Sequence, residues 1–208
     1  MKVAICVPCR DQVCAGFSFD LANMVGFHAA AGMEIGLYQS PGTLIADQRV
    51  NLAKEAIAQG ATDILWIDSD MRFPKNALQR LLARNKTIVA ANYATRRIPV
   101  ETTALVLGDA GWVHIPTKKS STGLEKVTAC GMGLMLTSAN VFKDLADPWF
   151  HIGYSTKNGI FLGEDVSFCM QAAKKGHDTY IDHDISKEVR HIGTFEFVLE
   201  HSEINDGD

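Results

Sequence analysis

The first half of the chain alternates short apolar runs with amphipathic segments, and this alternation limits the folds that the chain can adopt. Four runs have the length and apolar content of buried strands: Lys2–Val7, Glu34–Gln39, Ile64–Ile67 and Thr87–Ala91. The segments between them predict helices over Ser18–Ala31, Leu44–Gln59 and Asn76–Arg84. This order is typical of an α/β domain with a Rossmann-like, mostly parallel central sheet and helices on both faces.

The second half of the chain has strand-like runs with little helix between them. These runs predict a small antiparallel portion: Thr102–Leu107, Trp112–Ile115 and Lys126–Thr137. A helix is expected over Asp165–Lys175, before a glycine stop. We therefore expect residues 1–200 to form a single domain and the acidic segment 201–208 to be a flexible tail.

Composition narrows the functional classes. The chain has 208 residues, of which 47% are apolar, and so suits one globular domain. Its formal net charge is −4 and no stretch is dominated by Lys and Arg, which argues against general nucleic-acid binding. The sequence shows no apolar run of membrane-spanning length and no signal segment, so a soluble, cytoplasmic protein is expected.

The five cysteines could form a metal site or remain buried thiols. Cys6-x-x-Cys9 with Cys14 is part of a metal-binding pattern, but no second pair completes a zinc ribbon. Cys6 also lies inside an apolar run, as a strand residue would. The sequence therefore favours reduced, buried thiols here and at Cys130 and Cys169.

The motif Asp68-Ser69-Asp70 is the strongest functional signal. It directly follows the run Ile64–Ile67, at the carboxyl end of a strand, where open α/β sheets bind ligands. Two carboxylates separated by one small residue can hold a divalent cation, or a cation and a ribose hydroxyl. Oxygen ligands suit Mn²⁺ or Mg²⁺, which neutralise a diphosphate. The alternative for so short a motif is a solvated acidic turn.

A strand that ends in this motif and leads into a helix, after an initial strand–helix–strand–helix unit, resembles the GT-A glycosyltransferases, particularly the family-2-like enzymes. The resemblance extends over most of the chain. In that family the loop after the first strand and the helix before the acidic motif hold the nucleotide. The resemblance implies donor-binding roles for these residues: Pro8, Arg10, Asp11, Arg49, Asn51, Asp68 and Ser69.

Two later features add to the resemblance. Glu164-Asp165 opens a predicted helix and resembles the acidic pair of the family, in which one carboxylate is the catalytic base. The resemblance implies this role for Asp165, or failing that for Glu164. Acidic residues also favour helix N-termini for structural reasons alone.

The family often completes its metal site with a late histidine, and His191 resembles that ligand. The implied metal ligands are Asp68, Asp70 and His191, with Mn²⁺ favoured by the imidazole. His183, between Asp182 and Asp184, offers a rival acidic–histidine cluster.

Glycines and aromatic residues mark the expected acceptor side. Gly131-Met132-Gly133 has the place of a glycine-containing strand that lines this side in the family, although a bulge or close packing explains the glycines equally well. Trp149 and Phe150 could stack on a sugar face or anchor a hydrophobic core.

These features predict a metal-dependent glycosyltransferase that moves a sugar from a nucleoside-diphosphate-sugar to an acceptor hydroxyl, with inversion if Asp165 is the base. A UDP-sugar donor is favoured and a GDP-sugar is possible. The acceptor could be a glycan, a lipid, a protein or a modified nucleobase, and the oligomeric state is open. The alternatives are a nucleotidyltransferase, whose glycine-rich loop is missing after the first strand, and an inactive nucleotide- or carbohydrate-binding module.

Overall fold

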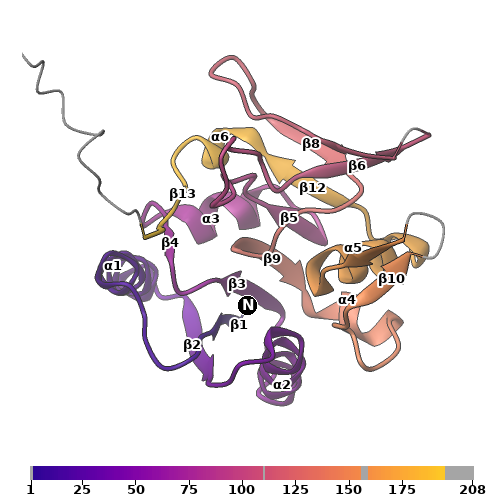
Figure 1. Ribbon diagram of the computed structural model, residues 1–208. Coiled ribbons are helices and arrows are strands. Elements are labelled where there is room, and N and C mark those ends of the chain that lie inside the picture. Colours follow the sequence, from indigo (N-terminus) through magenta and orange to yellow (C-terminus); the bar gives the residue numbers. More distant parts are fainter. Residues whose placement is uncertain (1, 110, 156–158, 195–208) are drawn as a thin grey trace, which may run out of the picture.

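Side chains alternate across the strands and so separate two apolar cores on opposite faces of one sheet. Figure 1 shows how the strands and the surrounding helices are arranged. The computed structural model describes residues 2–109, 111–155 and 159–194. The central sheet has seven strands in the order β2-β1-β3-β9-β5-β12-β8. Its strands are β1 Lys2–Pro8, β2 Glu34–Ser40, β3 Asp63–Ile67, β5 Ile88–Ala90, β8 Leu124–Val127, β9 Leu134–Ser138 and β12 Thr179–Asp182.

The sheet is mixed. Strands β1, β2 and β3 pair in parallel, as do β5 and β12, whereas β9 is antiparallel to both β3 and β5. Five strands therefore run in one direction, and their carboxyl ends share one edge of the sheet. At the far edge, β8 is antiparallel to β12. The expected α/β class is confirmed, with a mixed central sheet in which five of the seven strands share one direction.

Helices cover both faces, as the sequence pattern predicts. On one face, α1 (Ala15–Ala30) and α3 (Ala77–Ala83) pack against the core that contains Ile5 and Leu65. The other face is covered by α2 Ile45–Ala58, α4 Ala139–Asp144 and α5 Glu164–Lys174, which pack around Trp66. The last helix, α6 His183–Ser186, follows β12 directly.

Three two-stranded sheets lie outside the central sheet. They pair β4 Met71–Arg72 with β13 Arg190–His191, β6 Leu105–Gly108 with β7 Gly111–His114, and β10 Gly153–Ser155 with β11 Ile160–Leu162. They supply the antiparallel portion that was expected in the second half. The β4–β13 pair has the greatest consequence, because it joins the acidic motif to a segment more than a hundred residues later.

The first helix begins earlier than the sequence indicates. Its N-cap is Cys14, and the hydroxyl of Ser18, the predicted cap, instead donates to the Cys14 carbonyl oxygen at 3.4 Å. The Cys14 amide donates to the carbonyl oxygen of Ser69 at 3.1 Å. A tertiary hydrogen bond to the acidic motif therefore determines where α1 starts.

The predicted strand Lys126–Thr137 is wrong, because this segment forms two strands in different places. The first, β8, lies at the sheet edge, and the second, β9, lies between β3 and β5. The interruption contains Gly131 and Gly133, which pack against the ring of Tyr93. Residues 128–133 connect the two strands, and most of them are buried.

The cysteines are free thiols, as the sequence favours. Cys6 and Cys9 belong to opposite cores, so their sulfur atoms lie on different faces of the sheet and do not share a site. Burial raises the pKa of Cys6 far above its ordinary value, and that of Cys169 to about 11. Among the described residues, none of the helices is both long enough and apolar enough to span a membrane. The predicted tail 201–208 lies outside the described residues.

Candidate functional site

The acidic motif follows β3 at the carboxyl edge of the sheet. Strand β3 ends at Ile67, and the backbone then forms a tight turn in which the Met71 amide donates to the Asp68 carbonyl oxygen at 3.1 Å. The Asp68 amide donates to the Gly133 carbonyl oxygen at 3.1 Å. These backbone hydrogen bonds hold the backbone of the acidic motif in place at the end of β3.

A buried arginine joins the acidic motif to helix α5. The side chain of Arg49, on α2, is only 2% exposed, and its Nη2 lies 3.0 Å from Asp68 Oδ1. Its Nε lies 3.3 Å from Glu164 Oε1. Burial raises the pKa of Asp68, and the charge of Arg49 opposes that rise. Arg49 is thus a shared counter-ion for two carboxylates that are far apart in the sequence.

Asp70 is paired with an imidazole and a guanidinium. His191 Nε2 lies 3.4 Å from Asp70 Oδ2, and Arg96 Nη1 lies 2.8 Å from the same oxygen. Burial alone would raise the pKa of Asp70, but the hydrogen bond and charge of His191 and the charge of Arg96 lower it. The hydrogen bond with Asp70 in turn raises the pKa of His191.

The β4–β13 pair places His191 beside Asp70. His191 is opposite Met71 in the register, and the Ile192 amide donates to the Asp70 carbonyl oxygen at 2.8 Å. The other ring nitrogen, Nδ1, lies 3.0 Å from the Ala94 carbonyl oxygen. The imidazole is therefore held by backbone contacts on one side and faces Asp70 with Nε2.

Tyr93 supports both the histidine and the glycine segment. Its ring meets the His191 ring edge-on, with 5.3 Å between centroids. Its hydroxyl accepts a hydrogen bond from the Gly133 amide at 3.0 Å. A Cβ at Gly131 or Gly133 would come within 2.6 Å of the Tyr93 side chain. Close packing against Tyr93 therefore explains both glycines, which is the alternative that the sequence left open.

The acidic pair begins helix α5 next to these groups. Burial raises the pKa of Glu164; the charge of Arg49 lowers it and that of Asp165 raises it. Asp165 Oδ1 accepts a hydrogen bond from the Val166 amide at 2.7 Å. The negative charge of Asp165 also raises the pKa of Asp68 and that of Tyr93. Arg49 thus joins Asp68, after β3, to Glu164, at the start of α5.

A cavity of about 350 Å³ opens over the acidic motif. Predicted site residues line it, namely Pro8, Arg10, Asp68, Ser69, Asp70 and His191. Sequence reasoning missed Gln48 and Arg96, which also line it. Gln48 ties the ends of β1 and β2 together by donating to the carbonyl oxygens of Cys9 and Ser40 at 2.7 and 2.6 Å. In the sequence, its position next to Arg49 is the one feature that could have indicated a role for Gln48 at the site.

Three predicted donor-binding residues, and the acidic pair Glu164-Asp165, are not among the residues that line this cavity. Arg49 is buried between Asp68 and Glu164. Asn51 is exposed on α2, where its amide donates to Asp47 at 3.2 Å. Asp11 lines a second cavity of about 700 Å³, on the other side of Cys9, between α1 and the edge strand β2. The walls of this larger cavity are largely apolar, with Val7, Phe17 and Leu37 among them. Asp11 is the one charged residue among the described residues that line it.

The donor atoms at Asp70 and His191 fit a divalent cation only in part. A carboxylate oxygen and an imidazole nitrogen suit Mn²⁺. Within residues 2–109, 111–155 and 159–194, however, no three or more His, Cys, Asp and Glu side chains gather in a way that could hold a metal ion. Asp68, the third predicted ligand, is paired with Arg49. These residues therefore suit a cation that completes its coordination with phosphate and water.

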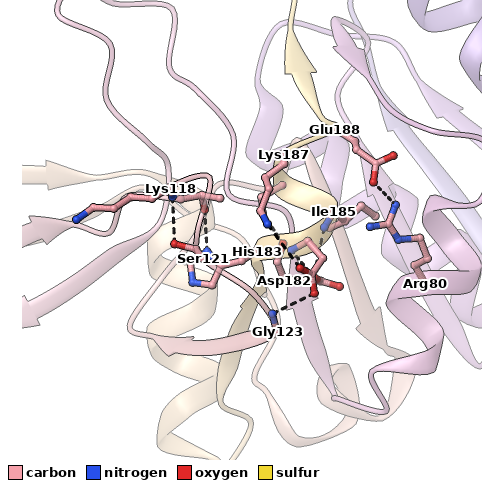
Figure 2. Close-up of polar contacts among 12 residues, drawn as sticks. Arg80, Lys118, Ser121, Gly123, Asp182, His183, Ile185, Lys187 and Glu188 are labelled. Atoms are coloured by element: carbon pink, nitrogen blue, oxygen red, sulfur yellow. Dashed lines mark hydrogen bonds and ion pairs between the residues drawn. The ribbon is translucent and has the colours of Figure 1, made fainter.

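The rival cluster at His183 has a structural role (Figure 2). His183 is 4% exposed, and its ring nitrogens contact Thr117 Oγ1 at 2.9 Å and Glu125 Oε2 at 2.8 Å. Asp182 caps α6 by accepting from backbone amides and pairs with Arg84 at 2.7 Å. These groups have partners within the fold, which explains their sequence pattern without a ligand.

No protein-family profile matches the chain, and no curated protein matches its sequence. Solved structures do match its fold. A197 from STIV superimposes with a TM-score of 0.58 at 13% identity, over 97% of this chain and 99% of that one. S. aureus TarS 1-349 in complex with UDP-GlcNAc superimposes with a TM-score of 0.55 at 12% identity, over 98% of this chain and 62% of TarS 1-349.

A second structure of S. aureus TarS 1-349 agrees, with a TM-score of 0.53 at 13% identity, over 92% of this chain and 60% of that one. This chain thus spans about three fifths of the length of the TarS fragment. At such low identity the likeness establishes the fold. It is the GT-A, glycosyltransferase-like fold that the sequence resemblance implied.

Proposed function

We propose that this chain is a nucleotide-sugar-dependent glycosyltransferase. The observation that carries the proposal is the convergence of Asp68, Asp70 and His191 on one cavity at the carboxyl edge of the sheet. Ligands of open α/β sheets bind at this edge. A structure with a similar fold, S. aureus TarS 1-349, was solved in complex with UDP-GlcNAc, which supports a nucleoside-diphosphate-sugar as the donor class.

The nucleotide is held by the ends of β1 and β2. Pro8 and Arg10 line the cavity beside the acidic motif, and Gln48 fixes the two strand ends to each other. Asp68 contacts the ribose or the cation through water, and Arg49 keeps its carboxylate oriented. A UDP-sugar is the favoured donor.

Asp70 and His191 would hold a Mn²⁺ or Mg²⁺ ion, which supplies Lewis-acid stabilisation of the departing diphosphate. Asp165 is the base that takes the proton of the acceptor hydroxyl, with Glu164 as the alternative. The support for Asp165 is that Glu164 is paired with Arg49 at 3.3 Å, whereas Asp165 forms no ion pair among the described residues. A single displacement with this base inverts the anomeric carbon.

The test is thermal stabilisation of the protein by sugar nucleotides. UDP- and GDP-sugars are added singly, each with Mn²⁺, Mg²⁺ or EDTA, and the melting temperature is measured. A ligand that binds only the native state raises its stability by mass action. We expect one donor to raise the melting temperature in Mn²⁺ but not in EDTA, and Asp70→Ala to abolish the shift.

Product analysis then identifies the reaction. With the stabilising donor and a panel of acceptors, release of free nucleoside diphosphate indicates sugar transfer. Release of pyrophosphate from a nucleoside triphosphate and a sugar phosphate would instead indicate a nucleotidyltransferase. If Asp70→Ala retained the metal-dependent shift, the acidic motif would have no part in donor binding and the proposal would fail.

A further inference from the structure

Arg96 places a positive charge on the carboxylate that is proposed to hold the cation. Its Nη1 contacts Asp70 Oδ2 at 2.8 Å, the oxygen that His191 Nε2 also approaches. Arg96 and both of these residues line the same cavity. The guanidinium is therefore inside the cavity in which a charged ligand would bind.

The backbone around Arg96 is held by hydrogen bonds, whereas its side chain is largely exposed and lines the cavity. Ala94 forms a bridge with Thr102, and the Thr95 amide donates to the Glu101 carbonyl oxygen at 2.8 Å. The Arg96 side chain is 56% exposed. A change of rotamer can thus move the guanidinium from Asp70 to another partner without rearranging the backbone.

Gly193 determines how closely Arg96 approaches. A Cβ at Gly193 would lie 3.2 Å from Arg96 Cδ, which is tighter than an ordinary contact. Gly193 lies two residues after His191, the last residue of β13. The same segment therefore positions the imidazole and leaves room for the arginine stem beside it.

A divalent cation and the guanidinium compete for Asp70. Like charges on the same carboxylate repel each other at short range. A diphosphate removes the conflict, because its oxygens can bind the cation and accept hydrogen bonds from the guanidinium at once. The planar fork of arginine matches the geometry of phosphate oxygens.

We propose that Arg96 binds the diphosphate of the donor and exchanges Asp70 for phosphate oxygens when donor and cation enter. This inference rests on the proposed function and adds a residue that the acidic motif does not imply. Before the donor enters, Arg96 neutralises Asp70 and weakens binding of the cation alone. The cation and the diphosphate then bind cooperatively, and by linkage each strengthens the other by the same factor.

Arg96→Ala tests the exchange because its two expected effects have opposite signs. Titration calorimetry measures UDP and GDP binding in saturating Mn²⁺, and Mn²⁺ binding is measured separately without nucleotide. We expect the variant to bind the nucleoside diphosphate about 10-fold more weakly, since it loses charge-assisted hydrogen bonds. We expect it to bind Mn²⁺ alone several-fold more tightly, since Asp70 is released.

Arg97→Ala is the matched control. It removes the same charge from the adjacent exposed position, and among the described residues Arg97 forms no ion pair with the acidic motif. Both affinities should stay near those of the wild type. Arg96→Lys keeps the charge without the fork and should restore the weak Mn²⁺ binding while recovering only part of the nucleotide affinity.

The outcomes separate this inference from the proposed function. If the wild type binds UDP or GDP and Arg96→Ala changes neither affinity, the Arg96 assignment is wrong and the transferase proposal stands. If both affinities change in the same direction, Arg96 supports the site only structurally and the exchange is wrong. If the wild type binds neither nucleotide, with or without Mn²⁺, both the proposed function and the role of Arg96 are overturned.

Discussion

Arg49 shows how one buried side chain can organise a site. Arginine is rarely buried unless it is paired, and here it is 2% exposed between Asp68 and Glu164. Its Nη1 atom is buried and has no hydrogen-bond partner among the described residues. The two carboxylates therefore offset the cost of burying the Arg49 charge, and Arg49 in turn neutralises them.

Replacing Arg49 should be strongly destabilising. Arg49→Met leaves Asp68 and Glu164 without their shared counter-ion, and breaking a buried ion pair in this way costs about 3 kcal/mol. Urea denaturation measures the change in the free energy of unfolding. Asn51→Ala, on the exposed side of the same helix, should stay within about 0.5 kcal/mol of the wild type. Equal effects of the two substitutions would contradict the assigned role of Arg49.

Glu164 makes the stability of the protein depend on pH. Burial raises its pKa above the ordinary value of 4.5, so the folded state binds this proton more tightly than the unfolded state does. The resulting stabilisation is complete below about pH 4.5 and is lost as the pH rises through the raised pKa. We expect Glu164→Gln to lessen this fall when unfolding is measured between pH 4.5 and 7. An unchanged pH profile would show that Glu164 titrates at its ordinary value.

At the scale of elements, the junction between β8 and β9 depends on contact with one aromatic ring. Gly131 and Gly133 lie against Tyr93, and the Gly133 carbonyl oxygen accepts the amide hydrogen of Asp68. The glycines therefore connect the packing of Tyr93 to the position of the acidic motif.

A methyl group at Gly133 should disturb this junction. Its Cβ would lie 2.6 Å from the Tyr93 ring, and overpacking of this kind costs about 1–3 kcal/mol. Gly26→Ala is the matched control, because its Cβ meets nothing within 4 Å in helix α1. There, the helix propensity of alanine should stabilise the protein by about 0.5–1 kcal/mol. Thermal unfolding of the two variants should shift in opposite directions, and destabilisation by both would contradict this account.

Across the whole molecule, ion pairs at the carboxyl edge join distant parts of the chain. Arg84, at the end of α3, binds both oxygens of Asp182, which is completely buried at the end of β12. Asp182 also caps α6, so one carboxylate connects α3, β12 and α6. This connection lies on the same edge of the sheet as the acidic motif but serves the architecture.

Replacing Arg84 should destabilise the fold at this edge of the sheet. Arg84→Ala leaves the buried Asp182 carboxylate without its cation and is expected to cost about 3 kcal/mol in urea unfolding. Arg80→Ala removes the more exposed pair with Glu188, which should cost less than about 1 kcal/mol. If Arg80→Ala proved the more harmful substitution, the structural role of the Asp182 cluster would be wrong.

The sequence by itself determined the α/β class, the helices and strands of the first half, and the acidic motif after β3. These features follow from local periodicity and from short motifs, which neighbouring residues express without help from the rest of the chain. The sequence also indicated Glu164, Asp165 and His191 through a family resemblance. Ser18 as a helix cap and a single strand over Lys126–Thr137 were wrong, because contacts with Ser69 and Tyr93 override local preference.

Only the tertiary structure decided which side chains meet. Antiparallel insertion of β9, the pairing of β13 with β4 and the burial of Arg49 each depend on residues far apart in the chain. The ion pair between Arg96 and Asp70 has the same origin, and no sequence motif indicates it. Such contacts arise from packing and charge pairing in three dimensions, which a linear pattern does not encode.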